Sequence, residues 1–262
     1  MINYQRWISE KLQIVNKKQE TVPFTLNKVQ QDFLDTLGGR DIVLKARQMG
    51  FSSIILAMFT ADFLLLENTY NVVVADVDDN AMGLLSRVKF FIQTYEQKTG
   101  RKVPLKYNSR TELFLPEMNN YYKIGSAKNT EFGRSKTITN LHLSELAFYH
   151  NPEAIFGSAI QAVIPTGRVI IETTANGFNW FKELWDRSGE RGFKKHFYNP
   201  KWEYDSAYLE EKKKELERLF PQEYPMTEEE AFLTSGDLYF KQEALREYLH
   251  DIKEPIKIDE SV

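Results

Sequence analysis

The 262-residue sequence contains no cysteine, which excludes disulfides, thiolate metal sites and a cysteine nucleophile. It also has no apolar run of the roughly 18 residues that a bilayer-spanning helix needs. The longest candidate, Ile54–Leu66, is interrupted by Thr60 and Asp62, so it predicts a buried helix. The first twenty residues are polar and of mixed charge, which is not the pattern of a signal peptide. The lack of cysteine is compatible with a reducing compartment such as the cytosol but does not prove one.

An excess of positive charge is missing as well. The formal net charge is −3, so the chain is not a basic coat for nucleic acid, and contact with DNA would need local patches or several copies. The sequence does have an apolar fraction of 42%, with 18 Phe and 13 Tyr, which is enough for a globular core and argues against general disorder. The length allows one large domain, or a domain with a small appendage.

Short apolar runs alternate with helical periodicity along the chain. Buried strands are expected at 41–44, 71–75, 138–143 and 168–172, and helices at 52–66 and 80–99. The first forty residues are expected to be mainly helical, and 103–125 to form short strands. This alternation predicts an α/β fold, a largely parallel sheet with helices on both faces.

The composition changes after about residue 190. A charged helix is expected at 208–219, followed by a loop that Pro221 and Pro225 punctuate. We therefore expect a core at 1–190 and a lid or linker at 191–262. Among the remaining polar clusters, Asp78 or Asp79 is expected to cap a helix, and the four histidines show no ligand spacing.

Asp41–Ser53 (DIVLKARQMGFSS) predicts a strand, a loop and a helix in succession. In this context backbone N–H groups and a helix N-terminus can bind phosphate. Compared with the Walker A pattern G-x-x-x-x-G-K-[ST], Gly50 and Ser52 match, while Lys45 replaces the first glycine and Phe51 replaces the lysine. An ordinary turn followed by a serine cap would give the same pattern.

Chemistry favours the phosphate-binding interpretation of this loop. The β- and γ-phosphates of a nucleotide need a cation, and Lys45 can supply it from the start of the loop instead of from its end. Arg47 can add a second positive charge at the transferred phosphoryl group. The apolar Phe51 can do neither and is expected to pack.

Two further strand ends carry polar residues. Ile138–Tyr149 (ITNLHLSELAFY) places Ser144 and Glu145 after an apolar strand, where an acidic residue can orient or activate water. An ordinary solvated carboxylate is an equal alternative. Val169–Gly177 (VIIETTANG) ends in threonines that can sense a γ-phosphate, although a β-branched strand followed by an Asn-Gly turn also explains it.

Together, in this order, the three motifs resemble the ATPase domain of large terminase subunits of tailed bacteriophages. The resemblance extends roughly over residues 24–240. Phe24–Leu34 resembles the adenine-recognition segment of that family, and Pro225–Phe232 resembles the segment that closes its ATPase domain. The resemblance to the terminase ATPase domain implies a P-loop NTPase fold of the ASCE or RecA-like type. It also implies ATP and Mg²⁺ as ligands, and ATP hydrolysis coupled to DNA translocation.

The resemblance also implies roles for individual residues. Those expected to bind the nucleotide are Gln30, Lys45, Arg47, Gln48, Met49, Gly50, Phe51, Ser52 and Ser53. Those expected to act in catalysis are Lys45, Arg47, Glu145 and Arg134, the last as an arginine finger or, equally, as a loop arginine facing DNA or solvent. Those expected to couple hydrolysis to movement are Thr173, Thr174 and Ala175. Ser52 is the expected metal ligand, with Ser144 binding weakly or through water.

Two departures from the family pattern matter. Ser144 stands where the magnesium-binding aspartate is expected, so the metal site is incomplete by sequence. An RNase H-like nuclease has no room after the ATPase segment, which indicates an excised domain or a subunit without the nuclease.

The expected partners are double-stranded DNA, a portal protein, a small terminase subunit and further copies in a ring, although the isolated chain could be a monomer. The expected location is the host cytoplasm, with no membrane contact. Two alternatives stay open. One is a helicase or remodeller, which would normally carry two such cores. The other is a nucleotide-binding or DNA-docking scaffold with little hydrolysis.

Overall fold

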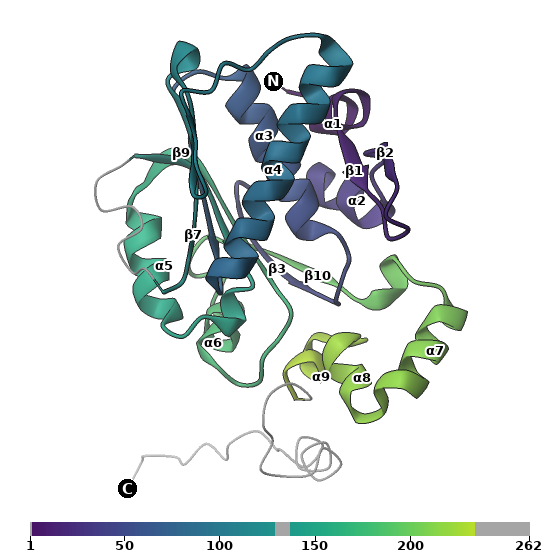
Figure 1. The fold of residues 1–262 in the computed structure, drawn as a ribbon. Coiled ribbons are helices and arrows are strands. Elements are labelled where there is room, and N and C mark those ends of the chain that lie inside the picture. The colour runs from purple at the N-terminus through teal and green to yellow at the C-terminus, as the bar shows by residue number, and fades with distance from the viewer. Residues whose placement is uncertain (1, 129–136, 234–262) are drawn as a thin grey trace, which may run out of the picture.

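The computed structural model describes residues 2–128 and 137–233, and within them one large sheet forms the centre of the molecule (Figure 1). The order of its eight strands is β10-β3-β9-β8-β4-β7-β6-β5. Neighbouring strands from β10 to β7 are parallel, and only β6 and β5 run antiparallel to their neighbours. The prediction of a largely parallel sheet is confirmed. The strands are β3 (Arg40–Lys45), β4 (Tyr70–Ala75), β5 (Tyr107–Asn108), β6 (Glu112–Leu115), β7 (Asn120–Ser126), β8 (Ile138–Ser144), β9 (Val163–Thr173) and β10 (Lys194–Tyr198).

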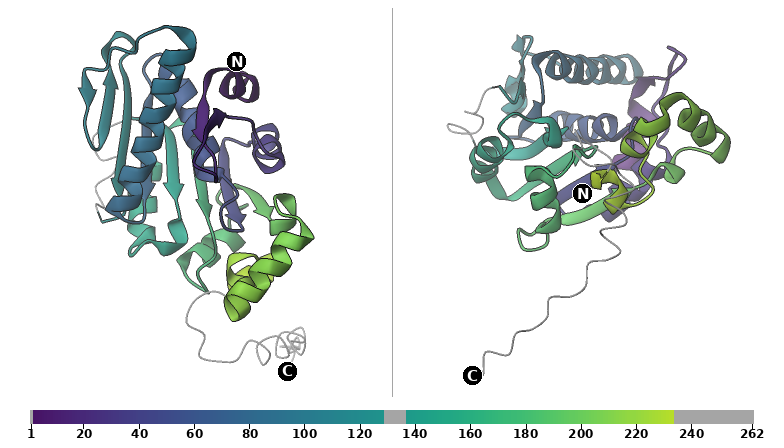
Figure 2. Two further views of the ribbon diagram at one scale, coloured as in Figure 1. Left: turned by 45° about the vertical axis from the view of Figure 1, so that its right-hand side comes forward. Right: turned by 90° about the horizontal axis from the view of Figure 1, so that it is seen from below.

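Helices cover both faces of the sheet (Figures 1 and 2). One face carries α1 (Tyr4–Lys11), α2 (Lys28–Thr36), α3 (Phe51–Leu65) and α4 (Asp78–Thr99), and the other carries α5 (Pro152–Gln161) and α6 (Trp180–Asp186). Each face has its own hydrophobic cluster. Helix α3 is apolar on nearly all sides because the sheet, α1 and α4 enclose it. This enclosure fixes the N-terminus of α3 against the ends of the central strands.

The segment after β10, called the lid segment or lid below, forms a group of short helices beside the C-terminal ends of the strands (Figure 1). It contains α7 (Ser206–Leu216), α8 (Phe220–Glu223) and α9 (Glu228–Leu233). The expected boundary at residue 190 falls before β10, which pairs with β3 and so belongs to the sheet. The sequence Lys-Lys-His-Phe-Tyr of β10 lacks the continuous apolar run by which the inner strands were predicted. The short 3-10 helices are η1 (Pro116–Met118), η2 (Leu146–Phe148), η3 (Pro200–Trp202) and η4 (Glu217–Leu219).

Two local predictions are wrong. The N-terminal region is not mainly helical, because β1 (Gln13–Val15) and β2 (Thr21–Pro23) form an antiparallel hairpin between α1 and α2. Helix α4 begins at Asp78 with Val77 in the N-cap position, so no aspartate caps it. The Asp78 carboxylate instead accepts a hydrogen bond from the Ser126 hydroxyl on β7. None of the described helices is long and apolar enough to cross a membrane.

Candidate functional site

The loop predicted to bind phosphate, called the phosphate loop below, joins the end of β3 to the start of α3. Strand β3 ends at Lys45, helix α3 begins at Phe51, and the backbone between them is left-handed at Gln48 (φ 59°) and Gly50 (φ 82°). A Cβ at Gly50 would lie 2.6 Å from the Gln30 side-chain nitrogen, which donates a hydrogen bond to the Gly50 carbonyl over 2.9 Å. The left-handed conformation therefore favours glycine here, and a side chain at this position would also displace the Gln30 amide. The loop ends at a helix N-terminus, whose free N–H groups favour an anion.

A cavity of about 960 Å³ opens beside this loop. Its lining brings together the hairpin between α1 and α2, Gln30 on α2, the loop from Arg47 to Ser53, and Glu145. This volume is in the range of small-molecule sites. The Gln30 amide makes two hydrogen bonds: its nitrogen donates to the Gly50 carbonyl, and its oxygen accepts from the Asn27 backbone N–H over 3.1 Å. The side-chain nitrogen and oxygen of Gln30 are also the groups that could form hydrogen bonds with a nucleotide base.

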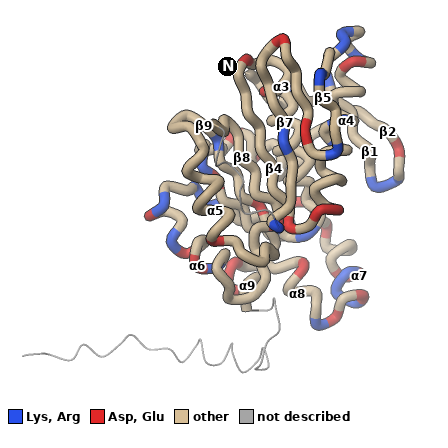
Figure 3. The backbone as a smooth tube through the Cα atoms, turned by 60° about the vertical axis from the view of Figure 1, so that its left-hand side comes forward, with Lys and Arg blue, Asp and Glu red and all other residues tan. Residues whose placement is uncertain are grey.

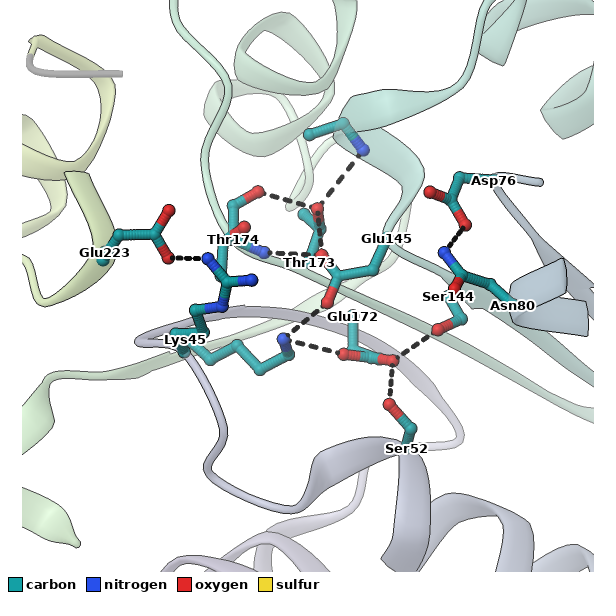
Figure 4. A network of polar contacts seen from close by, with 12 residues as sticks. Lys45, Ser52, Asp76, Asn80, Ser144, Glu145, Glu172, Thr173, Thr174 and Glu223 are labelled. Atoms are coloured by element: carbon teal, nitrogen blue, oxygen red, sulfur yellow. Dashed lines mark hydrogen bonds and ion pairs between the residues drawn. The ribbon is translucent and has the colours of Figure 1, made fainter. Parts of the chain in front are cut away.

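Lys45 lies between two carboxylates at the strand end (Figure 4). Its Nζ is 2.9 Å from Glu145 Oε1 and 3.2 Å from Glu172 Oε2, and its side chain is 6% exposed. Burial alone would lower the Lys45 pKa, but the charges of the two carboxylates outweigh burial and raise that pKa above its ordinary value. Lys45 is therefore a fixed positive charge beside the loop, held in place by Glu145 and Glu172.

Glu145 connects the second and third motifs. It follows β8 in a left-handed conformation (φ 57°, ψ 44°), which is uncommon for a residue with a Cβ and recurs at functional sites. Its Oε2 accepts hydrogen bonds from the Thr174 backbone N–H over 3.1 Å and the Thr173 hydroxyl over 3.3 Å. Ala175 is 2% exposed and packs in the cluster below α6. Two hydrogen bonds therefore connect the Glu145 carboxylate to the end of β9.

Glu172 was not among the site residues expected from the sequence. Its side chain is fully buried, and its Oε1 accepts hydrogen bonds from the hydroxyls of Ser52 and Ser144, each over 2.8 Å. Burial raises the pKa of this carboxyl, but the charge of Lys45, the nearby His142 imidazole and the hydrogen bond from Ser144 hold the pKa below its ordinary range. A glutamate at the end of the apolar run Val-Ile-Ile was the only sequence signal. Its partners come from other strands, which a sequence pattern does not reveal.

The predicted arginines differ in their surroundings. Arg47 Nη1 lies 3.0 Å from Glu223 Oε2 on the lid, and its side chain is 60% exposed. Arg134 lies outside the described residues.

Arg87 on α4 was not predicted, yet it lines the cavity and donates to the Ser53 hydroxyl over 3.1 Å. Within 2–128 and 137–233, Arg87 forms no ion pair, so it is a charge available to an anionic ligand.

Met49 and Phe51 contribute to the loop through their backbone. Both side chains are buried, and the Phe51 ring packs against Phe33 and Tyr198 with centroids 5.4 and 5.0 Å away. The expectation that Phe51 packs is confirmed. Tyr204 fixes the opposite side of the loop, because its hydroxyl donates to the carbonyls of Arg47 and Gln48, each over 3.0 Å.

The oxygen atoms at the strand ends suit magnesium. The hydroxyls of Ser52 and Ser144 and the carboxylate of Glu172 converge on one point. Mg²⁺ prefers oxygen ligands and usually takes only one or two from protein, with phosphate and water completing its octahedron. In the part of the chain that the structure describes, no cluster of three His, Cys, Asp or Glu side chains could hold a metal alone. The residues therefore fit a metal that arrives with a nucleotide.

No protein-family model and no curated protein matches the chain, but solved structures of large terminases do. The ATPase domain of the large terminase of Thermus phage P74-26 has a TM-score of 0.59 at 18% identity, covering 75% of this chain and 91% of that domain. The bacteriophage HK97 large terminase has a TM-score of 0.60 at 18% identity, over 94% of this chain and 52% of that one.

A third structure, the large terminase of a thermophilic bacteriophage in complex with ADP, has a TM-score of 0.53 at 13% identity, over 74% of this chain and 50% of that one. The chain therefore spans about half the length of the HK97 protein and of this ADP-bound protein. At these identities the similarity establishes the fold. The chain has the fold of a large terminase ATPase domain, a P-loop NTPase sheet with helices on both faces.

Proposed function

We propose that the chain is the ATP-hydrolysing motor of a DNA-packaging terminase, which couples hydrolysis to the movement of double-stranded DNA into a procapsid. The observation that carries this proposal is the direct contact of Lys45, Glu145 and Thr174 beside a nucleotide-sized cavity. Phosphoryl transfer needs a fixed cation and a group that orients water, and these residues supply both. The fold adds support, because one solved neighbour is itself a terminase ATPase domain.

The loop would bind the phosphates of ATP. Lys45 supplies positive charge from the start of the loop, and the backbone N–H groups of residues 48–53 surround the phosphate oxygens. Arg87 adds a second charge from α4, and Arg47 can join once it leaves Glu223. Gln30 lines the same cavity and is the residue we assign to adenine.

Hydrolysis would depend on Glu145. When a phosphate oxygen takes Lys45 as its partner, Glu145 Oε1 is free to accept a hydrogen bond from a water molecule. The water oxygen then attacks the γ-phosphorus while one water proton passes to Glu145 Oε1. The bond from that phosphorus to the bridging oxygen breaks, and ADP leaves with the bond's electron pair. Because Thr173 and Thr174 hold Glu145 Oε2, the change at Glu145 reaches β9 and Ala175, where we place the coupling to movement.

Magnesium supplies charge neutralisation of the β- and γ-phosphates when it is bound with ATP. Ser52, at the start of α3, is the direct ligand that we propose for it. Ser144 would contribute through water. Both hydroxyls are already oriented by the carboxylate of Glu172.

Contact with DNA would involve several copies of the chain. Lys and Arg are interspersed with Asp and Glu along the backbone, as in α7, and the net charge is −3 (Figure 3). A ring of subunits would present the same local Lys and Arg side chains several times to one duplex. The partners proposed with this function are double-stranded DNA, a portal protein and a small terminase subunit, in the host cytoplasm during virion assembly.

One observation favours the second candidate, a nucleotide-binding scaffold with little hydrolysis. Lys45 is occupied by two ion pairs, and Phe51 stands where the loop lysine is normally found. A scaffold would bind nucleotide without turning it over. Turnover is therefore the quantity that separates the two candidates.

Phosphate release from Mg-ATP, measured with and without double-stranded DNA, tests the proposal. We expect Mg²⁺-dependent release that double-stranded DNA increases severalfold, because DNA assembles the subunits that complete the site. The control is the same reaction with excess EDTA, which should release nothing above background. ATP binding without release in either condition would favour the scaffold, and the absence of both binding and release would contradict the proposal.

A further inference from the structure

Glu172 occupies a position in the sheet that explains the missing aspartate at 144. Strands β8 and β9 are parallel neighbours, and in their register Ser144 and Glu172 are directly paired. Glutamate is one methylene longer than aspartate, so from the adjacent strand its carboxylate reaches the site in front of Ser144. The hydroxyl of Ser144 contacts that carboxylate over 2.8 Å.

Serine at 144 and glutamate at 172 depend on each other. An aspartate at 144 would place a second buried carboxylate opposite Glu172, and like charges directly opposite in a sheet are destabilising. His142, two residues earlier on β8, places its Nε2 3.4 Å from Glu172 Oε1 and increases the crowding at this carboxylate. This position therefore has room for one buried carboxylate, and in this chain the carboxylate is that of Glu172 on β9.

The hydrogen bond from Ser52 fits a role at the metal. A serine hydroxyl has one proton and two lone pairs, so a hydroxyl that binds Mg²⁺ through a lone pair must donate its proton elsewhere. Ser52 donates to Glu172 Oε1 over 2.8 Å, which leaves its lone pairs directed away from that carboxylate (Figure 4). Partners of this kind orient a metal ligand and raise its basicity.

We propose that Glu172 provides the carboxylate of the magnesium site, in place of an aspartate at 144, by orienting Ser52 and accepting hydrogen bonds from the water ligands of Mg²⁺. This inference rests on the proposed function, since the metal arrives with ATP. Glu172 is a positioning residue, because it acts through Ser52 and water. Glu172 pairs with Lys45 through Oε2, and this ion pair does not explain why the hydroxyls of Ser52 and Ser144 both donate to Oε1.

The test is the affinity of the chain for the slowly hydrolysed analogue ATPγS, measured by calorimetry with Mg²⁺ and with EDTA. In the parent, Mg²⁺ should tighten binding, because it separates the phosphates from the Glu172 charge. In Glu172→Gln the enhancement by Mg²⁺ should fall by about tenfold or more, the cost typical of losing a partner of a metal ligand. Affinity in EDTA should rise in the same variant, because a negative charge near the phosphates is gone.

Two further variants complete the experiment. Glu145→Gln also removes an ion pair of Lys45 but should keep the Mg²⁺ enhancement, so it controls for the freed lysine. Ser144→Asp combined with Glu172→Gln returns the carboxylate to β8 and should restore the enhancement, and it carries the test if the single variant does not fold.

The outcomes separate the two claims. Full Mg²⁺ enhancement in folded Glu172→Gln, or none in the folded double variant, would overturn the inference alone. A parent chain without affinity for ATPγS in either condition would overturn the proposed function and the inference with it.

Discussion

Replacing Glu145 with glutamine is expected to lower ATP turnover by about 10²- to 10⁴-fold, the usual contribution of an acid-base group. Glutamine has the same shape and can still accept a hydrogen bond from the Thr174 backbone N–H. Lys45 keeps its contact with Glu172, so the loop stays in position. We therefore expect nucleotide affinity to change little while the rate of phosphate release falls by that factor. The measurement is single-turnover phosphate release from Mg-ATP beside a binding titration.

The matched control for this variant is Glu117→Gln. Glu117 is an exposed glutamate in η1 and contributes nothing to the cavity lining, so the parent rate is expected. A Glu145→Gln protein that releases phosphate at the parent rate would contradict the assignment of Glu145 as the group that orients water. Equal loss of binding and turnover would instead indicate that Glu145 mainly holds Lys45.

Replacing Lys45 with methionine is expected to damage stability and nucleotide binding together. The fully buried Glu172 would keep its charge without its cationic partner, and breaking one side of a buried ion pair costs about 3–5 kcal/mol. The phosphates would also lose the only lysine in the loop sequence. The measurements are chemical unfolding and a titration with ATPγS.

A double variant separates these two effects. Lys45→Met with Glu172→Gln removes the buried charge on both sides, so most of the lost stability should return while nucleotide affinity stays low. The control is Lys102→Met, which removes an exposed lysine 3.7 Å from Glu96 and should have a small effect on either quantity. Unchanged binding and turnover in Lys45→Met would show that the displaced-lysine hypothesis is wrong.

The strands of the candidate site, and the polar residues at their ends, could be predicted because each depends on a short local sequence pattern. Apolar runs located β3, β8 and β9, and a polar residue after each run indicated an edge where strand ends meet. The structure brings Lys45, Glu145 and Thr174 into contact at that edge. The prediction worked because parallel strands with helical connections place their carboxyl ends together, whatever the length of the connection.

Glu172 could not be predicted because its role depends on strand register. In the sequence Glu172 is the last residue of Val-Ile-Ile-Glu and directly precedes Thr173 and Thr174, which were expected to couple hydrolysis to movement. Only the pairing with Val43 on one side and Ser144 on the other places its carboxylate between the loop and β8. The sequence showed that position 144 lacks an aspartate, and the strand register adds that Glu172 is paired with this position.

The lid illustrates a second limit of sequence analysis. Pro221 and Pro225 indicated a loop, but no pattern linked this region to the phosphate loop. In the structure the Arg47 backbone N–H donates to the Glu223 carbonyl over 3.0 Å, and the two side chains form an ion pair. Arg47, predicted to reach the transferred phosphoryl group, is therefore tied to the lid at rest. Its predicted role requires that this contact opens.

We propose that the catalytic lysine stands at the start of the phosphate loop, at Lys45, and not at its end. A structure with Mg²⁺ and ATPγS tests this position most directly. We expect Lys45 Nζ to leave Glu145 and to lie within hydrogen-bonding distance of a β- or γ-phosphate oxygen, with the metal at Ser52. A nucleotide bound in the cavity while Lys45 keeps both carboxylates, with its phosphates held by other groups, would contradict it.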